Sequence, residues 1–446
     1  MATGFADLPA ADSVWITNAT VPVCLTDVSG LAVDRDGLAR ADIHVSASKI
    51  TAIRPAGLNS NTTPANGGSV RFDLDGGMIW PCFVDMHTHL DKGHIWARQP
   101  NPDGTFEGAL DSVRADREVH WTADDMRVRM DFSLKSAHAY GTKAIRTHLD
   151  SFVGQIDVTW PLFAELREEW AGKVDLQGVS LTAIDQTFDD ALMLEIVDAL
   201  KNHNGILGCV TFMIPELQDG LDHLFKTAID NDFDLDFHVD ETADSTARSL
   251  RVIAETALKF GFERRITVGH CCALARQPES EAKETLDMVA RANIAVVSLP
   301  LCNLYLQDRR PGATPRWRGV TLLHEMRDRG IPVAVASDNT RDPFYAYGDL
   351  DALEVFREAT RIIHLDHPFG TWPRSITTTP ASIMGIMDAG MLAVGGGADF
   401  TLFRARTWTE LLSRPQADRI VVRNGKSIDT TLPDYRELDV ILGDAK

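Results

Sequence analysis

Apolar and polar residues alternate along the central part of the chain in two different rhythms. Short apolar runs typical of buried strands recur eight times, and stretches with helical periodicity separate several of them, at 123–141, 190–203, 247–261 and 279–292. The expected strands lie at 78–89, 143–151, 174–183, 206–214, 235–241, 265–272, 294–302 and 331–339. Strands that alternate with helices in this way predict an α/β fold, a (β/α)8 TIM-type barrel.

Both ends of the chain follow a different pattern, with short strand-like segments broken by turns. These segments lie at 13–23, 41–55 and 69–81 near the start, and at 391–405 and 417–428 near the end. Because both ends show this pattern of short strands and turns, we expect them to complete a single β-sandwich domain. The predicted domains are therefore 1–77 with 388–446 for the sandwich, and 78–387 for the catalytic barrel.

Charge and cysteine content narrow the classes of partner. The chain has 44 Lys and Arg against 64 Asp and Glu, a net charge of −20. Nucleic acids and anionic membranes are disfavoured, since both require a basic surface. The six cysteines are scattered, no apolar run is long enough to span a bilayer, and the N-terminal segment lacks a signal-peptide pattern. We therefore expect a cytoplasmic protein with reduced thiols.

Metal-type ligands stand at the carboxyl ends of four expected strands, where barrel enzymes carry their chemistry. His87 and His89 end the first strand, and their spacing of two puts both imidazoles on one face. His238 ends the fifth strand on the face opposite Phe237, so it points into the barrel. His270 ends the sixth strand and Asp338 the eighth.

The motifs that carry these residues resemble a known family. FVDMHTHLDK, HVDE, GHCC and ASDN are similar to segments of the amidohydrolase superfamily, and within it to the bacterial cytosine deaminase group. The resemblance extends through GTFEGAL, RTHLD, LCNLYLQDR and DNTRDPFYAYG, and so covers nearly the whole chain.

The resemblance implies a site with one divalent metal ion, Zn²⁺ or Fe²⁺, bound by His87, His89, His238 and Asp338. Such an ion would make water available as a nucleophile near neutral pH. Glu241 would then move a proton from this water to a ring nitrogen. His270 would orient the water, and Asp338 would pass a second proton to the departing amine. The family resemblance also implies a homo-oligomer.

Two absences narrow the reaction. Two-metal members of the superfamily resemble one another in a carboxylated lysine on the fourth strand, and residues 205–216 contain no lysine. This favours a mononuclear deaminase over ring-opening hydrolases of the hydantoinase type. The zinc deaminases of polynucleotides use H-x-E with P-C-x-x-C, and neither motif is present.

The substrate pocket departs from the cytosine deaminase pattern. The usual substrate glutamine aligns with Ala183, and Gln186 lies three residues further on. Asn339 stands where the cytosine enzymes carry a second aspartate, and Phe344 where they carry the stacking tryptophan. Around the histidines, Lys92 is expected in a loop, Asp91 as a support for the imidazoles, and His148 in barrel packing or substrate contact.

We therefore expect a metal-dependent hydrolase that deaminates a small aminated nitrogen heterocycle and releases ammonia. A cytosine-like pyrimidine is the leading substrate, with 5-substituted cytosine, isocytosine and creatinine left open. The alternative enzyme deaminates or N-dealkylates s-triazines of the ammelide type, since SDN-x-RD resembles those enzymes, although they lack the glutamate of HVDE. A non-catalytic structural relative would have lost ligands, whereas every ligand position is filled here.

Overall fold

The computed structural model describes residues 8–57 and 69–442. It divides into two compact units, each assembled from separate stretches of the chain. Unit 1 holds the described residues up to Val84, together with Ala137–Ala144 and Ala352–Leu432. Unit 2 holds Asp85–Ser136, Ile145–Asp351 and the described residues from Pro433. The division follows spatial contacts, and the domain bounds expected from the sequence stay a prediction.

Unit 1 contains one hydrogen-bonded sheet to which both parts of the chain contribute, with strands in the order β16-β15-β14-β5-β1-β2-β3 and β4 paired to β1. Its strands are β1 (Ser13–Pro22), β2 (Leu38–Ser46), β3 (Lys49–Pro55), β4 (Val70–Asp73), β5 (Met78–Pro81), β14 (Phe400–Phe403), β15 (Ile420–Arg423) and β16 (Lys426–Ser427). The composite origin of this sheet agrees with the sequence pattern. The second layer of a sandwich stays a prediction.

The core of unit 1 explains why distant segments join in this sheet. Alternate residues of β1 such as Val14 and Ile16 pack with Phe400 and Leu402 of β14 in one apolar cluster. The helical elements of this unit are η1 (Val23–Leu25), α10 (Ala352–Ile363), η4 (Trp372–Ile376), α11 (Thr378–Met384) and α12 (Trp408–Leu412).

Unit 2 is built on parallel strands that are largely buried, with an exposed residue, Asp175, at the start of β8. They form a three-stranded sheet, β6-β7-β8, and a five-stranded sheet, β13-β12-β11-β10-β9. Their bounds are β6 (Phe83–Thr88), β7 (Thr142–Asp150), β8 (Asp175–Leu181), β9 (Leu207–Thr211), β10 (Leu235–Val239), β11 (Ile266–His270), β12 (Ile294–Ser298) and β13 (Val333–Val335). Seven of the eight strand segments expected from the sequence contain one of these strands, and the segment 143–151 begins one residue inside β7.

Isolated parallel bridges lie at the borders of the two sheets. Val179 pairs with Ile206 and Ala183 with Val210, beside β8 and β9. Thr88, the last residue of β6, pairs with Asp338, which follows β13. The carboxyl ends of the first and last strands are therefore neighbours, which matters for the site described below.

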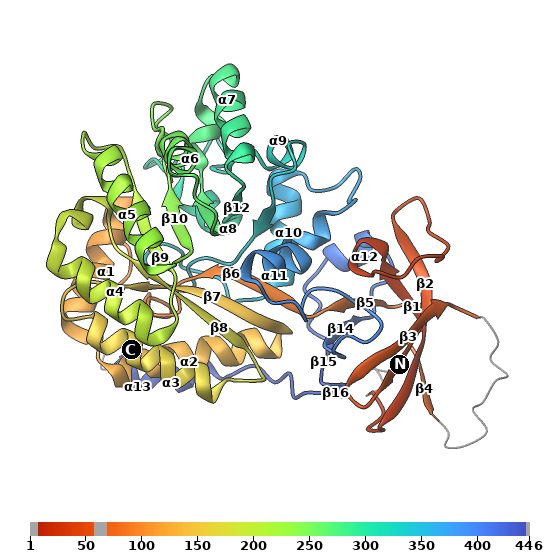
Figure 1. Ribbon diagram of the computed structural model, residues 1–446. Coiled ribbons are helices and arrows are strands. Elements are labelled where there is room, and N and C mark those ends of the chain that lie inside the picture. Colours follow the sequence, from red (N-terminus) through yellow and green to blue (C-terminus); the bar gives the residue numbers. More distant parts are fainter. Residues whose placement is uncertain (1–7, 58–68, 443–446) are drawn as a thin grey trace. The chain divides into compact units, whose positions relative to one another are not determined.

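Helices follow the strands of unit 2, which confirms the α/β class. They are α1 (Phe106–His120), α2 (Ala123–Ala139), α3 (Ile156–Glu169), η2 (Ile184–Phe188), α4 (Asp190–His203), α5 (Leu217–Asn231), α6 (Ser249–Phe260), η3 (Cys272–Arg276), α7 (Glu279–Arg291), α8 (Pro300–Leu306), α9 (Leu323–Arg327), η5 (Tyr435–Leu438) and α13 (Asp439–Leu442). Consecutive helices pack on one another, as Figure 1 shows for α5, α6 and α7. In the part of the chain that the model describes, no helix combines the length and the apolar character needed to cross a bilayer.

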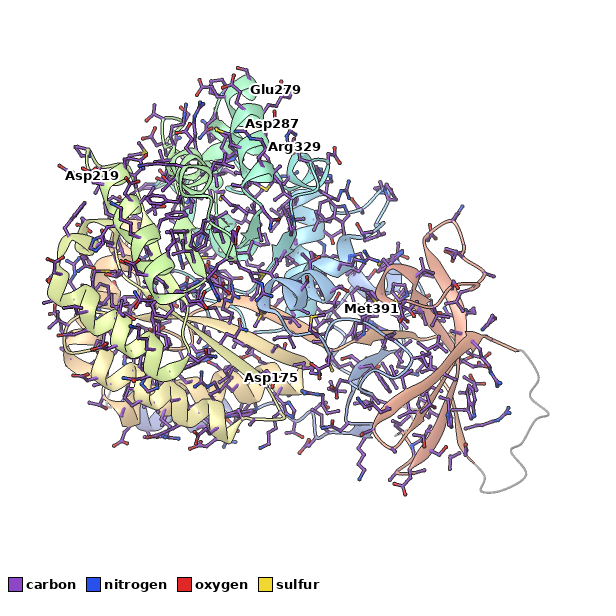
Figure 2. All side chains as sticks on the ribbon, in the orientation of Figure 1. Asp175, Asp219, Glu279, Asp287, Arg329 and Met391 are labelled. Carbon is purple, nitrogen blue, oxygen red and sulfur yellow. The ribbon has the colours of Figure 1, made fainter. Side chains whose placement is uncertain are left out.

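Local sequence signals set the ends of several helices. The Asp189 side chain accepts hydrogen bonds from the first amides of α4, and Asn204 ends this helix with a left-handed backbone. Gly261 ends α6 in the same way. Figure 2 labels Asp287 on α7 and Arg329 after α9, whose side chains pair at 2.7 Å.

One expected element is corrected. Residues 78–89 were predicted as one strand, and they form two. Ile79 and Trp80 of β5 pair with β14 in the sheet of unit 1, whereas β6 begins at Phe83 beside β7. Pro81, which has no amide hydrogen to donate, ends β5. An uninterrupted apolar run therefore hides a change from one sheet to another.

Candidate active site

Three histidines bring their Nε2 atoms together at the strand ends. His87 lies near the end of β6 and His89 just after it, so the alternation of the strand places both imidazoles on one face. The His238 Nε2 atom, from β10, lies 3.1 Å from His87 Nε2 and 3.1 Å from His89 Nε2. All three side chains are buried.

Asp338 completes this cluster from the end of the last strand. Its amide nitrogen donates to the carbonyl oxygen of His87 at 2.9 Å, which fixes the register between the two chain segments. Its Oδ1 atom lies 3.5 Å from His87 Nε2 and 3.3 Å from His89 Nε2. The backbone at Asp338 has a φ of 65°, a left-handed value that a non-glycine residue adopts at a cost and that is often found at functional sites.

The donor set of this cluster fits a divalent metal. Burial and the neighbouring positive groups lower the pKa of His87, His89 and His238 well below the ordinary value, so the imidazoles are neutral and offer lone pairs. Neither Asp338 oxygen receives a hydrogen bond from a nitrogen or oxygen donor of the described residues. Three nitrogens and one carboxylate that face one another without hydrogens to share suit Zn²⁺ or Fe²⁺.

Gly269 makes room for one of these imidazoles. It precedes His270 on β11 and pairs in register with His238. A Cβ atom at this position would lie 2.9 Å from His87 Cε1, closer than such atoms approach in real structures. The missing side chain of Gly269 is therefore part of the way in which the fold holds His87.

Glu241 and His270 form a second group beside the histidine cluster. The Glu241 Oε1 atom lies 3.3 Å from His270 Nδ1. Although burial lowers the pKa of His270, the Glu241 and Asp338 carboxylates outweigh burial and raise it. The other ring nitrogen, Nε2, is buried and has no hydrogen-bond partner in residues 8–57 and 69–442. Glu241 and His270 both line a cavity that lies over the histidine cluster.

A cavity of about 1110 Å³ opens over the cluster. The predicted substrate residues Gln186, Asn339 and Phe344 all line it, together with His89 and His238. Thr182 Oγ1 and the Ala183 amide donate to Gln186 Oε1 at 2.9 and 3.2 Å, which fixes the orientation of the glutamine amide.

Asn339 and Phe344 are held by a residue that the sequence analysis did not single out. Asn339 Nδ2 donates to Asp342 Oδ2 at 2.7 Å, and the Cys302 thiol donates to the amide oxygen of Asn339 at 3.8 Å. The amides of Phe344 and Tyr345 donate to Asp342 Oδ1. Phe106 packs edge-on against Phe344, with ring centres 5.5 Å apart.

Lys92 lies in the cavity wall and forms an ion pair with a carboxylate. Its Nζ atom is 2.5 Å from Asp150 Oδ1, and Arg117 donates to Asp150 Oδ2 at 2.8 Å. Asp91, expected beside the histidines, instead accepts a hydrogen bond from the Asp150 amide at 2.7 Å.

His148 lies among the metal-type histidines and does not line the cavity. Its ring centre is 4.1 Å from that of His87. Its Nε2 atom is 3.2 Å from Asp236 Oδ1, and Arg146 donates to Asp236 Oδ2 at 2.8 Å. Of the two alternatives raised for His148, the structure therefore favours packing inside the unit over substrate contact.

Asn303 is a second residue of this site, besides Asp342, that the sequence did not indicate. It lies on α8, and its side chain contacts both Glu241 and His270. The only sequence signal was a polar residue in the first turn after an expected strand, inside the segment LCNLYLQDR.

The family model described as "Amidohydrolase family" matches residues 70–160 and 164–429. The chain belongs to this family. The resemblance inferred from the strand-end motifs is thereby confirmed, and so is the expectation of a hydrolytic enzyme.

Single proteins similar to this chain are also amidohydrolases or deaminases by name. The chain is 54% identical over 443 residues to a pterin deaminase of Rhizobium rhizogenes, with 99% of this chain and 100% of the relative covered. It is 25% identical over 384 residues to an N-isopropylammelide isopropyl amidohydrolase of a Pseudomonas species, covering 81% and 89% of the two chains.

Solved structures share the fold. A 5-methylcytosine deaminase from Klebsiella pneumoniae with bound phosphonocytosine superposes with a TM-score of 0.79 at 22% identity, covering 95% of this chain and 99% of that one. An N-isopropylammelide isopropylaminohydrolase from Burkholderia multivorans superposes with a TM-score of 0.73 at 23% identity, covering 95% and 100%.

Proposed function

We propose that this amidohydrolase removes the 2-amino group of pterins by hydrolysis, with ammonia and a pteridine-2,4-dione as products. The observation that carries the proposal is the identity of 54% to a pterin deaminase over 99% of this chain and 100% of the relative. The sequence analysis placed a cytosine-like pyrimidine first, and the proposal replaces it.

The chemistry of the two ring systems is closely related. The pyrimidine ring of a pterin carries the 2-amino-4-oxo pattern of isocytosine, one of the heterocycles left open by the sequence. The cavity of about 1110 Å³ exceeds the size of a single pyrimidine ring and accommodates a fused bicycle. Both points support a pterin without requiring new catalytic groups.

The residues of the site divide the reaction between them. A divalent metal held by His87, His89, His238 and Asp338 would supply Lewis-acid activation of the attacking water. Glu241 accepts a proton from this water and delivers it to the ring nitrogen next to C2. His270 orients the water through its buried Nε2 atom.

The second half of the reaction expels the amine. The water oxygen has bonded to C2, and the bond from C2 to the amino nitrogen breaks. Asp338 carries the second proton of the water to the departing nitrogen, so that ammonia leaves and C2 keeps a carbonyl oxygen.

Three cavity residues would hold the heterocycle. Asn339 offers an amide oxygen to a ring N–H, since its Nδ2 group is engaged by Asp342. Phe344 offers an aromatic face, and Gln186 a second amide at the cavity wall. Such contacts fix the ring relative to Glu241.

The test is a comparison of ammonia release by metal-loaded protein from pterin, isocytosine, cytosine and 5-methylcytosine. We expect kcat/KM for pterin to exceed that for each single-ring substrate by at least about tenfold, a difference of 1.4 kcal/mol. A higher kcat/KM for cytosine or isocytosine would overturn the pterin assignment. Release of isopropylamine from N-isopropylammelide, without ammonia from pterin, would favour the dealkylating alternative.

We also infer that the eight strands of unit 2 close into a barrel. The single bridges Val179–Ile206 and Thr88–Asp338 at the two sheet borders support this closure. A closed barrel places all eight carboxyl strand ends around one opening, where the histidines and Glu241 lie. The homo-oligomer implied by the resemblance stays a prediction.

A further inference from the structure

Asn303 is the buried residue that joins the two proton-handling groups of the site. The helix α8 begins with Pro300 shortly after β12. The backbone nitrogen of Asn303 donates to the carbonyl oxygen of Leu299 at 2.9 Å. The first turn of α8 thus lies at the same edge as the other functional side chains. The Asn303 side chain is fully buried there.

The amide group of Asn303 matches two acceptors. Its Nδ2 atom lies 2.9 Å from Glu241 Oε1 and 3.0 Å from His270 Nδ1. Both distances are shorter than the 3.3 Å between Glu241 Oε1 and His270 Nδ1. An amide NH₂ carries two hydrogens, so one group donates to both. Donation to His270 requires the neutral tautomer that carries its proton on Nε2 and leaves Nδ1 as the acceptor.

The orientation of this amide is informative. Asn303 Oδ1 is buried and has no hydrogen-bond partner in the part of the chain that the model describes. A reversed amide would bring this carbonyl oxygen against Glu241 Oε1, and two acceptors repel. A buried carbonyl is therefore left unpaired while both hydrogens are used, which is unusual for an asparagine kept only for stability.

The same helix holds Glu241 at a second point. Gln307, which ends α8, donates from Nε2 to the backbone oxygen of Glu241 at 3.2 Å. The carboxylate and the backbone of Glu241 are thus both tied to α8. The geometry of the proton shuttle depends on this helix, although Glu241 itself follows β10.

We propose that Asn303 is a positioning residue that keeps Glu241 and His270 aligned for proton transfer. Asn303 is not among the residues that line the cavity, so it acts through these two groups. The inference rests on the proposed function, in which Glu241 moves the proton and His270 orients the water. It predicts a defect in kcat with little change in substrate or metal binding.

The experiment compares two substitutions in the metal-loaded full chain. Asn303→Ala removes both hydrogen bonds, and we expect kcat on pterin to fall by about 10- to 100-fold, with KM within about threefold. Asn303→Asp keeps the shape but replaces the donor with a carboxylate that repels Glu241. We expect its kcat to fall at least as far, by about 10²–10⁴-fold. Both variants should retain about one metal ion per chain.

The order of the two variants separates positioning from packing. A residue that only filled space would tolerate the isosteric Asp better than Ala. The matched control is Asn101→Ala, which also removes a buried amide that donates to two carbonyl oxygens, those of Thr105 and Pro343. The control should lower Tm and leave kcat within about threefold.

Each outcome is decisive. Near-normal kcat in Asn303→Asp, or loss of metal in both variants, would overturn the positioning role while the proposed function stands. If Asn303→Asp does not fold, the split between kcat and KM in Asn303→Ala decides. If the wild-type chain releases no ammonia from any heterocycle tested, the proposed function fails, and the inference fails with it.

Discussion

Unit 2 contains two buried clusters of charged and polar side chains that resemble each other in composition and differ in how their atoms are satisfied. The first, here the closed cluster, consists of Arg98, Asp116, Trp121 and Asp125. The second, the open cluster, consists of His87, His89, His238 and Asp338.

In the closed cluster, the donors of Arg98 and Trp121 meet carboxylate oxygens, and Asp125 is also bound by Arg129 at 2.9 Å. Arg98 Nε and Nη2 donate to the two oxygens of Asp116, each at 2.8 Å. Trp121 Nε1 also donates to Asp116, at 2.8 Å, and the Arg98 guanidinium reaches Asp125 as well. Charges of opposite sign are paired in a bidentate geometry, and no ligand is needed to explain the arrangement.

In the open cluster, hydrogen-bond acceptors face other acceptors. Nitrogen lone pairs approach one another at 3.1 Å, and the Asp338 carboxylate receives no nitrogen or oxygen donor among the described residues. Burying such groups without a counter-charge is unfavourable. The difference indicates that burial of charge alone does not identify a functional site. What identifies it is a set of acceptors that converge on one point, where they can bind a single cation.

The largest effect is expected from His238→Ala, because His238 Nε2 is the atom that approaches both other imidazoles. The wild-type chain should bind about one metal ion, and the variant should bind almost none. Turnover should fall by at least about 10³-fold, since metal catalysis contributes several kcal/mol. Elemental analysis of purified protein and an ammonia assay measure both.

The control for this prediction is His223→Ala, on α5 and outside the cavity, which should keep its metal. Two tightly bound ions in active wild-type protein would contradict the single-metal site. Full metal content in His238→Ala would contradict the role of the open cluster.

Glu241→Gln should separate proton transfer from metal binding. Glutamine keeps the shape of the side chain and cannot carry the proton, so kcat should fall by about 10²–10⁴-fold at unchanged metal content. Glu216→Gln is the matched control, because Glu216 precedes α5 and does not line the cavity. Asp240 is a poor substitute for Glu241, since its two oxygens accept the Ser249 and Leu250 amides at the start of α6. Normal turnover in Glu241→Gln would refute the shuttle assignment.

Gly269→Ala should disturb the open cluster by a steric clash with His87. The added methyl group would meet the His87 ring at 2.9 Å, and a metal-binding imidazole has little freedom to move. We expect metal affinity to fall by about 10- to 100-fold, the range for residues that orient metal ligands. Competition with a chelator measures the affinity. Gly93→Ala, whose added methyl group would find only contacts of 3.5 Å or more, should leave the affinity unchanged, and equal losses in both variants would contradict the steric argument.

The sequence predicts the open cluster well, for a simple reason. The alternation of side chains along a strand places His87 and His89 on one face, and the carboxyl ends of parallel strands meet at one edge. The same rules place His238 and Asp338 beside them. The recurring pattern of apolar runs likewise predicted each strand of unit 2.

Other features depend on tertiary contacts that no local pattern encodes. Asn303 lies 62 positions from Glu241, and the two meet only because α8 packs beside the residues after β10. The switch of sheets within 78–89 is hidden by an uninterrupted apolar run. The substrate is least predictable, because Gln186 lies on η2 and Asn339 and Phe344 lie in the segment after β13, where small changes in loop geometry alter which ring fits.

The smallest effect on turnover is expected from Asp116→Asn, which breaks the closed cluster. The variant leaves the buried Arg98 guanidinium with one carboxylate partner, Asp125. Breaking a buried ion pair from one side typically costs about 3–5 kcal/mol of unfolding free energy, and the remaining partner should hold the loss near the lower end of this range. Because no residue of the closed cluster lines the cavity, kcat per folded molecule should stay within about twofold. Denaturant unfolding measures the loss of stability, and the ammonia assay measures kcat.

Glu169→Gln is the control for an exposed pair, since Glu169 binds Arg127 at 2.9 Å at the surface and should contribute at most about 1 kcal/mol. A variant of Asp116 that keeps its stability but loses metal or turnover would show that the closed cluster takes part in the chemistry, and the distinction between the two clusters would then be wrong.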